Sequence, residues 1–166
     1  MKNIMVIGDL MLDEYIHGTI NRMSPEAPIP IVDLERIDYT LGGAGNVVTN
    51  LRQLDRDSKI TIVGVVGEDE AGEKVLDLLD EAGVSTQTVS RVSDFKTTVK
   101  TRIVAGNKQI VRLDTQSNID VSGDLISFPE NFDVIIFSDY DYGVINKDII
   151  QTLVTTNAVT IADPKR

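Results

Sequence analysis

Residues 60–66 read Ile-Thr-Ile-Val-Gly-Val-Val, an apolar run dominated by β-branched side chains. A run of this kind is typical of a strand that is buried on both faces of a parallel sheet. The charged turn Gly67-Glu68-Asp69-Glu70 follows, apolar residues then recur at helical spacing over residues 71–82, and Gly83 is placed as a C-terminal cap. This stretch therefore predicts a strand followed by a helix.

Further strands and helices are indicated on both sides of this stretch. Short apolar runs predict buried strands, and apolar residues at helical spacing predict helices. The expected strands are Ile4–Ile7, Val84–Val92, Val134–Phe137 and Val159–Ala162, and the expected helices are Asn46–Leu54 and Lys147–Val154. The repeated order of strand and helix predicts an α/β fold with a parallel sheet and helices on both of its faces.

Two stretches, residues 14–36 and 95–114, do not follow this order. They are half polar and strand-like, and they contain no crossover helix; their expected strands are Tyr15–Ile20, Ile29–Leu34, Thr97–Val104 and Gln109–Leu113. Residues 105–108 read Ala-Gly-Asn-Lys, a hairpin turn, whereas residues 21–30 hold three prolines and predict an ordered loop. We expect a separate small sheet that stands over the main sheet as a lid.

Composition narrows the classes of function. The chain has 166 residues, of which 42% are hydrophobic and 25% charged, as expected for a single globular domain. Its net charge of −10 disfavours nucleic acid and anionic membranes as partners. No cysteine is present, which excludes disulfides and is compatible with a cytoplasmic location. A single histidine cannot build a histidine-cluster metal site, and we expect no resident metal.

Acidic side chains follow the first expected strand. In open α/β sheets, ligands lie beyond the carboxyl ends of the strands, and Asp9 and Asp13 fall in that zone. Either carboxylate can accept hydrogen bonds from the hydroxyl groups of a ligand. For Asp9 the alternative, that it caps a loop or a helix, carries equal weight. Asp13 is the better candidate for a ligand contact.

The segment Gly42-Gly43-Ala44-Gly45-Asn46 precedes an expected helix and reads as a glycine turn. Glycines let the backbone approach a ligand closely, and the Asn46 amide offers a donor and an acceptor to a vicinal diol. The spacing matches neither of the common nucleotide-binding glycine fingerprints. A purely structural tight turn is the alternative.

Cations gather on the two later strands of the expected lid. They are Lys100, Arg102, Lys108 and Arg112. Lys100 and Arg102 are two positions apart, so they share one face of a strand and would suit a phosphate monoester. The alternative is a solvated strand edge whose charges prevent aggregation. Asp139 and the segment Asp163-Pro164-Lys165 follow two further strands, and each is either a ligand contact or simple turn chemistry.

Eight segments carry a resemblance to a known family. In chain order they are Gly8-Asp9-Leu10-Met11-Leu12-Asp13, Met23-Ser24-Pro25-Glu26-Ala27-Pro28-Ile29-Pro30, Gly42-Gly43-Ala44-Gly45-Asn46-Val47, Val66-Gly67-Glu68-Asp69-Glu70-Ala71-Gly72, Lys100-Thr101-Arg102, Arg112-Leu113-Asp114, Ser138-Asp139-Tyr140 and Asp163-Pro164-Lys165. Together they resemble the ribokinase-like (PfkB) carbohydrate kinases, and most closely the heptose-7-phosphate kinase domain of the bifunctional ADP-heptose synthases.

The resemblance implies a Rossmann-like (ribokinase-like) domain, of which residues 1–166 are the N-terminal half, with a β-sheet lid. It implies transfer of the ATP γ-phosphate to a hydroxyl of a sugar or sugar phosphate with Mg²⁺, and a homodimer formed through the lid or a partner that covers the sheet edge. By position, the implied sugar contacts are Asp13, Gly42, Gly43 and Asn46, and the implied lid contacts are Lys100, Arg102 and Arg112.

Two departures from the family pattern bear on function. The Gly-Ala-Gly-Asp motif with the catalytic aspartate is expected beyond Arg166, so we expect no catalytic base and no complete nucleotide site in this chain. Relatives usually read Ser-Asp-Tyr-Ala-Lys-Gly where residues 138–143 read Ser-Asp-Tyr-Asp-Tyr-Gly, so Tyr142 replaces a lysine. The alternatives to a fragment of an active kinase are a non-catalytic sugar-binding or dimerisation module and one half of a split kinase.

Overall fold

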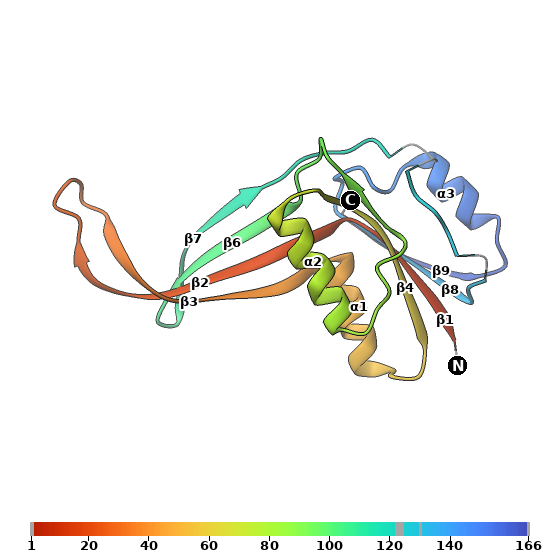
Figure 1. Cartoon of the computed structure of the whole chain (residues 1–166), viewed down its shortest axis with the longest axis horizontal. Helices are drawn as coiled ribbons and strands as arrows, with labels where there is room; N and C mark the ends of the chain where they lie inside the picture. The colour runs from red at the N-terminus through yellow and green to blue at the C-terminus, as the bar shows by residue number, and fades with distance from the viewer. Residues whose placement is uncertain (1, 122–124, 130, 166) are drawn as a thin grey trace.

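The computed structural model describes residues 2–121, 125–129 and 131–165 (Figure 1). Its elements are β1 Asn3–Gly8, β2 Leu10–Met23, β3 Pro30–Gly43, α1 Ala44–Leu54, β4 Lys59–Gly67, α2 Glu70–Glu81, β5 Val89–Val92, β6 Thr98–Ala105, β7 Lys108–Thr115, β8 Val134–Asp139, α3 Lys147–Val154 and β9 Val159–Pro164. The strands of this part of the chain form two sheets.

The first sheet has five strands in the order β5-β4-β1-β8-β9, and each neighbouring pair is parallel. The central strand β1 pairs with β4 on one side and with β8 on the other, so the strand order reverses there. A reversal of this kind opens a crevice at the carboxyl ends of the strands, where ligands of open α/β sheets bind. The predicted parallel sheet is confirmed.

The two faces of this sheet bury separate hydrophobic cores. On one face, Val6 of β1 packs with Val48 of α1 and Leu79 of α2. On the other face, Met5 of β1 packs with Ile149 of α3. Successive residues of β1 point to opposite faces because side chains alternate along a strand. Helices therefore cover both faces, as the sequence predicts.

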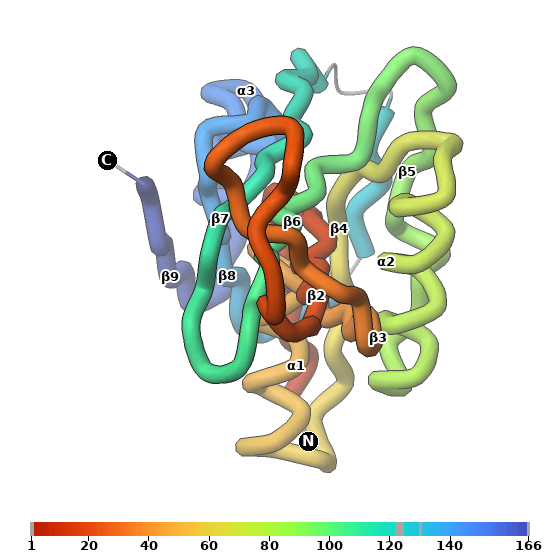
Figure 2. Tube along the Cα trace, turned by 90° about the vertical axis from the view of Figure 1, so that its left-hand side faces the viewer, coloured from red at the N-terminus to blue at the C-terminus, as the bar shows by residue number. Residues whose placement is uncertain are grey.

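The second sheet is mixed and has the strand order β3-β2-β6-β7. Strands β2 and β3 are antiparallel, β2 and β6 are parallel, and β6 and β7 form the predicted hairpin. The hairpin of β2 and β3 projects away from the three helices (Figure 1), and it lies in front of the first sheet in Figure 2.

Three sequence predictions need correction. Strands β2 and β3 extend well beyond residues 15–20 and 29–34, because their pairing continues to Leu10 and Gly43 at the first sheet. Residues 42–45 are not a turn: Gly42 is still paired in β3 and α1 begins at Ala44, so the change of direction is made at Gly43, whose φ is 56°. Of residues 84–92 only Val89–Val92 form a strand.

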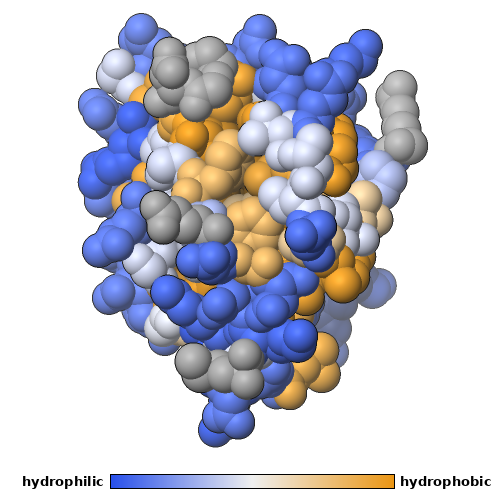
Figure 3. Space-filling model, turned by 90° about the vertical axis from the view of Figure 1, so that its right-hand side faces the viewer, coloured by the Kyte–Doolittle hydropathy of each residue, from blue (hydrophilic) through white to orange (hydrophobic). Residues whose placement is uncertain are grey.

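Apolar side chains remain exposed at both ends of the molecule. On the side where α3 lies in Figure 1, apolar atoms gather at the centre of the surface among polar ones (Figure 3). All residues of β9, the outermost strand of the first sheet, are exposed, and Val159 is 63% exposed. On the second sheet, Leu34 is 61% exposed. In the described ranges, no helix is long and apolar enough to cross a membrane.

Candidate functional site

Asp9 stands directly after β1 and holds the loop that follows β8. Its carboxylate accepts hydrogen bonds from the backbone N–H groups of Tyr140 at 2.8 Å and of Tyr142 and Val144, both at 3.3 Å. The side chain is only 2% exposed, and burial raises its pKa by more than these three hydrogen bonds lower it. Because its oxygens are committed to the backbone, Asp9 has the structural role that the sequence left as an alternative.

Asp13 lies four residues further along, on β2 of the second sheet, and it is paired with Arg102. The distance from Arg102 Nη1 to Asp13 Oδ1 is 2.6 Å, and each side chain is 19% exposed. Burial lowers the Arg102 pKa, but the hydrogen bond and the charge of Asp13 outweigh it, so the pKa lies above its ordinary value. The carboxylate is thus fixed in position by a permanently charged partner.

Gly42 closes the other side of Asp13. A Cβ atom at Gly42 would lie 2.9 Å from Asp13 Oδ2 and 2.6 Å from Met11 Cγ, so no larger residue fits without displacing one of them. The structure therefore brings together Asp13 and Gly42, two of the expected sugar contacts, and Arg102, one of the expected lid contacts. A carboxylate held at one oxygen still offers lone pairs to ligand hydroxyl groups.

Gly43 and Asn46 belong to the start of α1. Gly43 is the N-cap residue and has no side chain to bond the first amides of the helix. Asn46 is exposed in the first turn, and we find no hydrogen bond for its side chain within the described part of the chain. Gly43 follows Gly42 directly and Asn46 stands four positions after Gly42, but no hydrogen bond joins Asn46 to Asp13.

Lys100 and Arg112 meet at a third residue, Asp114. Lys100 Nζ lies 3.7 Å from one oxygen of Asp114, and Arg112 Nε lies 2.8 Å from the other. Lys100 pairs with Asp13 across β2 and β6, and Asp114 pairs with Lys100 across β6 and β7, so all three lie on one face of the sheet. Arg112 is half exposed and joins this face at its rim.

Tyr142 contacts Lys100, and the sequence did not indicate this contact. Its ring is buried, with 7% exposed, and its hydroxyl accepts a hydrogen bond from Lys100 Nζ at 3.1 Å. The hydroxyl also lies 3.3 Å from Gln116 Oε1, to which it donates. Lys165 Nζ is 5.1 Å from the ring centroid and donates to the carbonyl of Tyr140 at 3.1 Å. No sequence signal connects these positions, because they lie on three different elements.

Asp139 lies at the end of β8. Its Oδ1 accepts a hydrogen bond from the backbone N–H of Asp141 at 2.8 Å, which is the turn chemistry that the sequence left as an alternative. It also borders a hollow of about 160 Å³ whose lining residues are Asp139, Tyr140, Asp163, Pro164 and Lys165. The two strand-end segments predicted to meet at the ligand edge do lie side by side.

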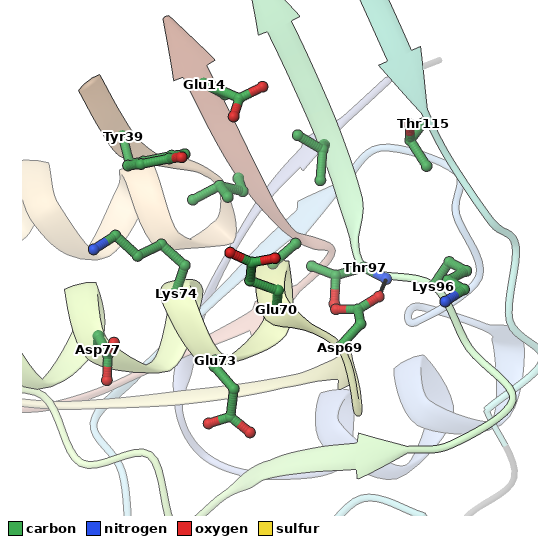
Figure 4. Close-up of a pocket in the computed structure, with 13 residues that line it drawn as sticks. Glu14, Tyr39, Asp69, Glu70, Glu73, Lys74, Asp77, Lys96, Thr97 and Thr115 are labelled. Atoms are coloured by element: carbon green, nitrogen blue, oxygen red, sulfur yellow. Dashed lines mark hydrogen bonds between the residues drawn. The ribbon is translucent and has the colours of Figure 1, made fainter. Parts of the chain in front are cut away.

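A larger cavity, of about 560 Å³, lies between the second sheet and α2 (Figure 4). Its lining includes Glu14, Tyr39, Glu70, Glu73 and Asp77. Glu14 follows Asp13 on β2, so it points to the opposite face of the sheet. The cavity therefore opens on the face that Asp13 and Lys100 do not share, and none of the predicted site residues lines it.

Asp69, on the wall of this cavity, is structural. It caps α2 by accepting a hydrogen bond from Gly72 N at 2.8 Å, and it accepts another from Thr97 N at 3.0 Å. Burial raises the Asp69 pKa, but the hydrogen bonds from Thr97 and Gly72 outweigh this effect and hold the pKa below its ordinary value.

The fold is that of the ribokinase-like kinases. The structure of an Arabidopsis thaliana ribokinase complexed with ribose and ATP superposes with a TM-score of 0.68, at 17% identity, over 98% of this chain and 53% of that one. A putative sugar kinase from Clostridium perfringens superposes with a TM-score of 0.66, at 14% identity, over 100% of this chain and 52% of that one. At such low identity these similarities show the fold alone.

The sequence comparison defines the family. The chain belongs to the pfkB family of carbohydrate kinases, whose family model matches residues 1–157. The bifunctional protein HldE of Campylobacter fetus is 39% identical over 175 residues, which cover 99% of this chain and 38% of that protein. The bifunctional protein HldE of Pelobacter propionicus is 42% identical over 156 residues, which cover 89% and 32%. The chain thus spans less than two fifths of the length of these relatives.

Proposed function

We propose that this chain is the substrate-binding half of a kinase that transfers the γ-phosphate of ATP to a hydroxyl of a sugar or sugar phosphate of the heptose 7-phosphate kind. The observation that carries the proposal is the Asp13 carboxylate, held by Arg102 and closed off by Gly42 beside the carboxyl end of β1. Membership of a carbohydrate kinase family and similarity to HldE proteins support it.

The role of these residues is to hold the substrate. Asp13 accepts hydrogen bonds from sugar hydroxyls, and Arg102 holds its carboxylate in a fixed orientation. The second sheet stands over the substrate as a lid and keeps the reacting hydroxyl in place, because orientation supplies much of the catalysis in phosphoryl transfer. Lack of cysteine agrees with a cytoplasmic enzyme.

We derive no binding site for the nucleotide or its Mg²⁺ from the described residues. The described residues contain no group of three or more His, Cys, Asp or Glu side chains that could hold a metal ion. The glycine segment at α1 does not have the spacing of a nucleotide-phosphate loop. We therefore assign ATP, Mg²⁺ and the catalytic base to the rest of such a kinase and derive no step from them here.

The test is calorimetric titration of the purified chain with heptose 7-phosphate and, separately, with ATP and Mg²⁺. We expect the sugar phosphate to bind and the nucleotide to bind weakly or not at all. Asp13→Asn removes the charge that Arg102 holds, so we expect sugar binding about tenfold weaker or more. Sugar binding that is unchanged in Asp13→Asn would show that the site lies elsewhere.

One observation favours a second function, that of an assembly module. Strand β9 is an edge strand whose residues are all exposed, and uncovered sheet edges with apolar side chains pair readily with other chains. A split kinase, in which a second polypeptide covers β9, fits this surface, whereas a homodimer through the second sheet would use exposed apolar side chains such as Leu34. Both are compatible with sugar binding by Asp13.

A further inference from the structure

Two lysines from different sheets converge on Tyr142. Lys100 comes from β6 of the second sheet, and Lys165 follows the last residues of β9 in the first sheet. Their Nζ atoms lie 5.4 Å and 5.1 Å from the centroid of the same ring. Two ammonium groups repel each other, so a group that attracts both is needed to hold them close together. Both lysines contact Tyr142, which offers the face of its ring and its hydroxyl oxygen.

The two lysines use different parts of the tyrosine. Lys100 donates a hydrogen bond to the hydroxyl at 3.1 Å, so its ammonium lies at the oxygen end of the ring and the contact is a hydrogen bond rather than a cation–π contact. Lys165 makes no such bond and is held by the ring and by the carbonyl of Tyr140. Because the ring is buried, it is not a surface on which a sugar could stack.

The ion pairs of these lysines are incomplete in the described part of the chain. Asp114 lies 3.7 Å from Lys100 Nζ but only 2.8 Å from Arg112 Nε, so it neutralises Arg112 more fully than Lys100. No carboxylate lies within 4.0 Å of Lys165 Nζ among the described residues. In a chain with a net charge of −10, this is a place where an anion would be attracted.

The position of Lys100 relative to Asp13 defines which kind of anion can bind. Lys100 and Asp13 are direct partners in the register of β6 and β2, so their side chains leave the same face about 5 Å apart. One small ligand can therefore reach both residues with a hydroxyl group at one end and an anionic group at the other. Lys165 lines the small hollow together with Asp139 and Asp163. The negative charges of these two aspartates disfavour an anion inside the hollow itself.

We propose that Lys100 and Lys165, positioned by Tyr142, bind the phosphate group of a phosphorylated sugar whose hydroxyls contact Asp13. This inference rests on the proposed function and adds to it the place of the substrate phosphate. Tyr142 acts as a positioning residue: its hydroxyl orients Lys100 and its ring orients Lys165.

The test compares a phosphorylated sugar with its unphosphorylated counterpart. The chain and its variants Tyr142→Phe and Lys165→Met are titrated with heptose 7-phosphate and with free heptose, and the dissociation constants are measured by calorimetry. Tyr142→Phe keeps the ring and removes the hydroxyl. Lys59→Met is the matched control for Lys165→Met, because Lys59 is exposed at the start of β4, at the amino ends of the strands, and its loss changes the net charge equally.

We expect both site variants to bind heptose 7-phosphate about tenfold more weakly while their affinity for free heptose stays the same. Lys59→Met should bind both ligands as the unchanged chain does. If Tyr142→Phe weakens the binding of both sugars equally, Tyr142 has a merely structural role. If the unchanged chain binds heptose 7-phosphate and free heptose with equal affinity, the proposed phosphate site is overturned, but the proposed function is not. Failure of the unchanged chain to bind either sugar would overturn the proposed function itself.

Discussion

Asp9 and Asp13 show how two residues of one type take different roles within one short segment. The carboxylate of Asp9 is surrounded by backbone N–H groups and serves the loop that follows β8. The carboxylate of Asp13 is paired with Arg102 through one oxygen, and we propose that its remaining lone pairs bind a ligand. Gly42 makes this arrangement possible, because only a residue without a side chain leaves room for the Asp13 oxygen.

Gly42→Ala tests this point. The added Cβ would lie within contact distance of Asp13 Oδ2 and Met11 Cγ, so the carboxylate must move. We expect about tenfold weaker binding of heptose 7-phosphate by calorimetry, with the far-ultraviolet circular dichroism unchanged. Gly106→Ala is the control: it strains a left-handed turn at the tip of the β6–β7 hairpin but has open space around it, so it should lower stability and leave binding intact. Full binding in Gly42→Ala would contradict the assigned role.

At the scale of elements, α2 is tied to the second sheet through its own cap. Asp69 bonds the first turn of α2 and also the backbone of Thr97, directly before β6. The hydroxyl of Thr97 in turn accepts a hydrogen bond from Gly67 N, at the end of β4, at 2.8 Å. Asp69 therefore holds both the start of α2, which packs on the first sheet, and the start of β6 in the second sheet.

We expect Asp69→Ala to lower the free energy of unfolding by about 1 kcal/mol or more, since an N-cap and a second hydrogen bond are lost. The pKa of Asp69 is below its ordinary value in the folded chain, so its contribution is present above about pH 4 and is lost as the pH falls through the folded pKa. Urea unfolding of the unchanged chain and of the Asp69→Ala variant, at pH 7 and at pH 3, measures the difference in the free energy of unfolding. A difference between the two chains that grows on acidification would contradict the assignment.

At the scale of the whole molecule, apolar side chains are exposed on both sheets. Leu34 stands on β3 of the second sheet and Val159 on β9 of the first, and each is more than half exposed. We propose that such side chains contribute to interaction sites, since exposed apolar patches often mark such sites. The two residues are on different sheets, so they report on two different surfaces.

We expect the chain to form a dimer through its second sheet. Leu34→Lys places a charge in that surface and should shift the chain to a monomer, whereas Val159→Lys should leave the dimer unchanged. Sedimentation velocity at several concentrations measures both. Dissociation by Val159→Lys alone would assign the contact to β9 instead, and a monomer in the unchanged chain at every concentration would refute dimerisation.

The sequence by itself determined the strand–helix order, the parallel sheet, the hairpin of β6 and β7, and the family. These features depend on local patterns, such as the apolar run at residues 60–66 and the turn at residues 105–108, which act within a few residues. The sequence also named Asp13, Gly42, Lys100 and Arg102, which the fold brings together. Its errors at the ends of β2 and β3 arose because pairing partners, not propensity, decide where a strand stops.

Only the tertiary structure decided that Asp9 holds a loop and that Asp13 is paired with Arg102. It also decided that Tyr142 meets Lys100, which is 42 residues away in the chain, and that Lys165 joins them. These contacts join β6, the loop after β8 and the end of β9, so no local pattern can encode them. Their physical basis is the pairing of strands that are distant in sequence, which brings side chains of both sheets to one edge of the molecule.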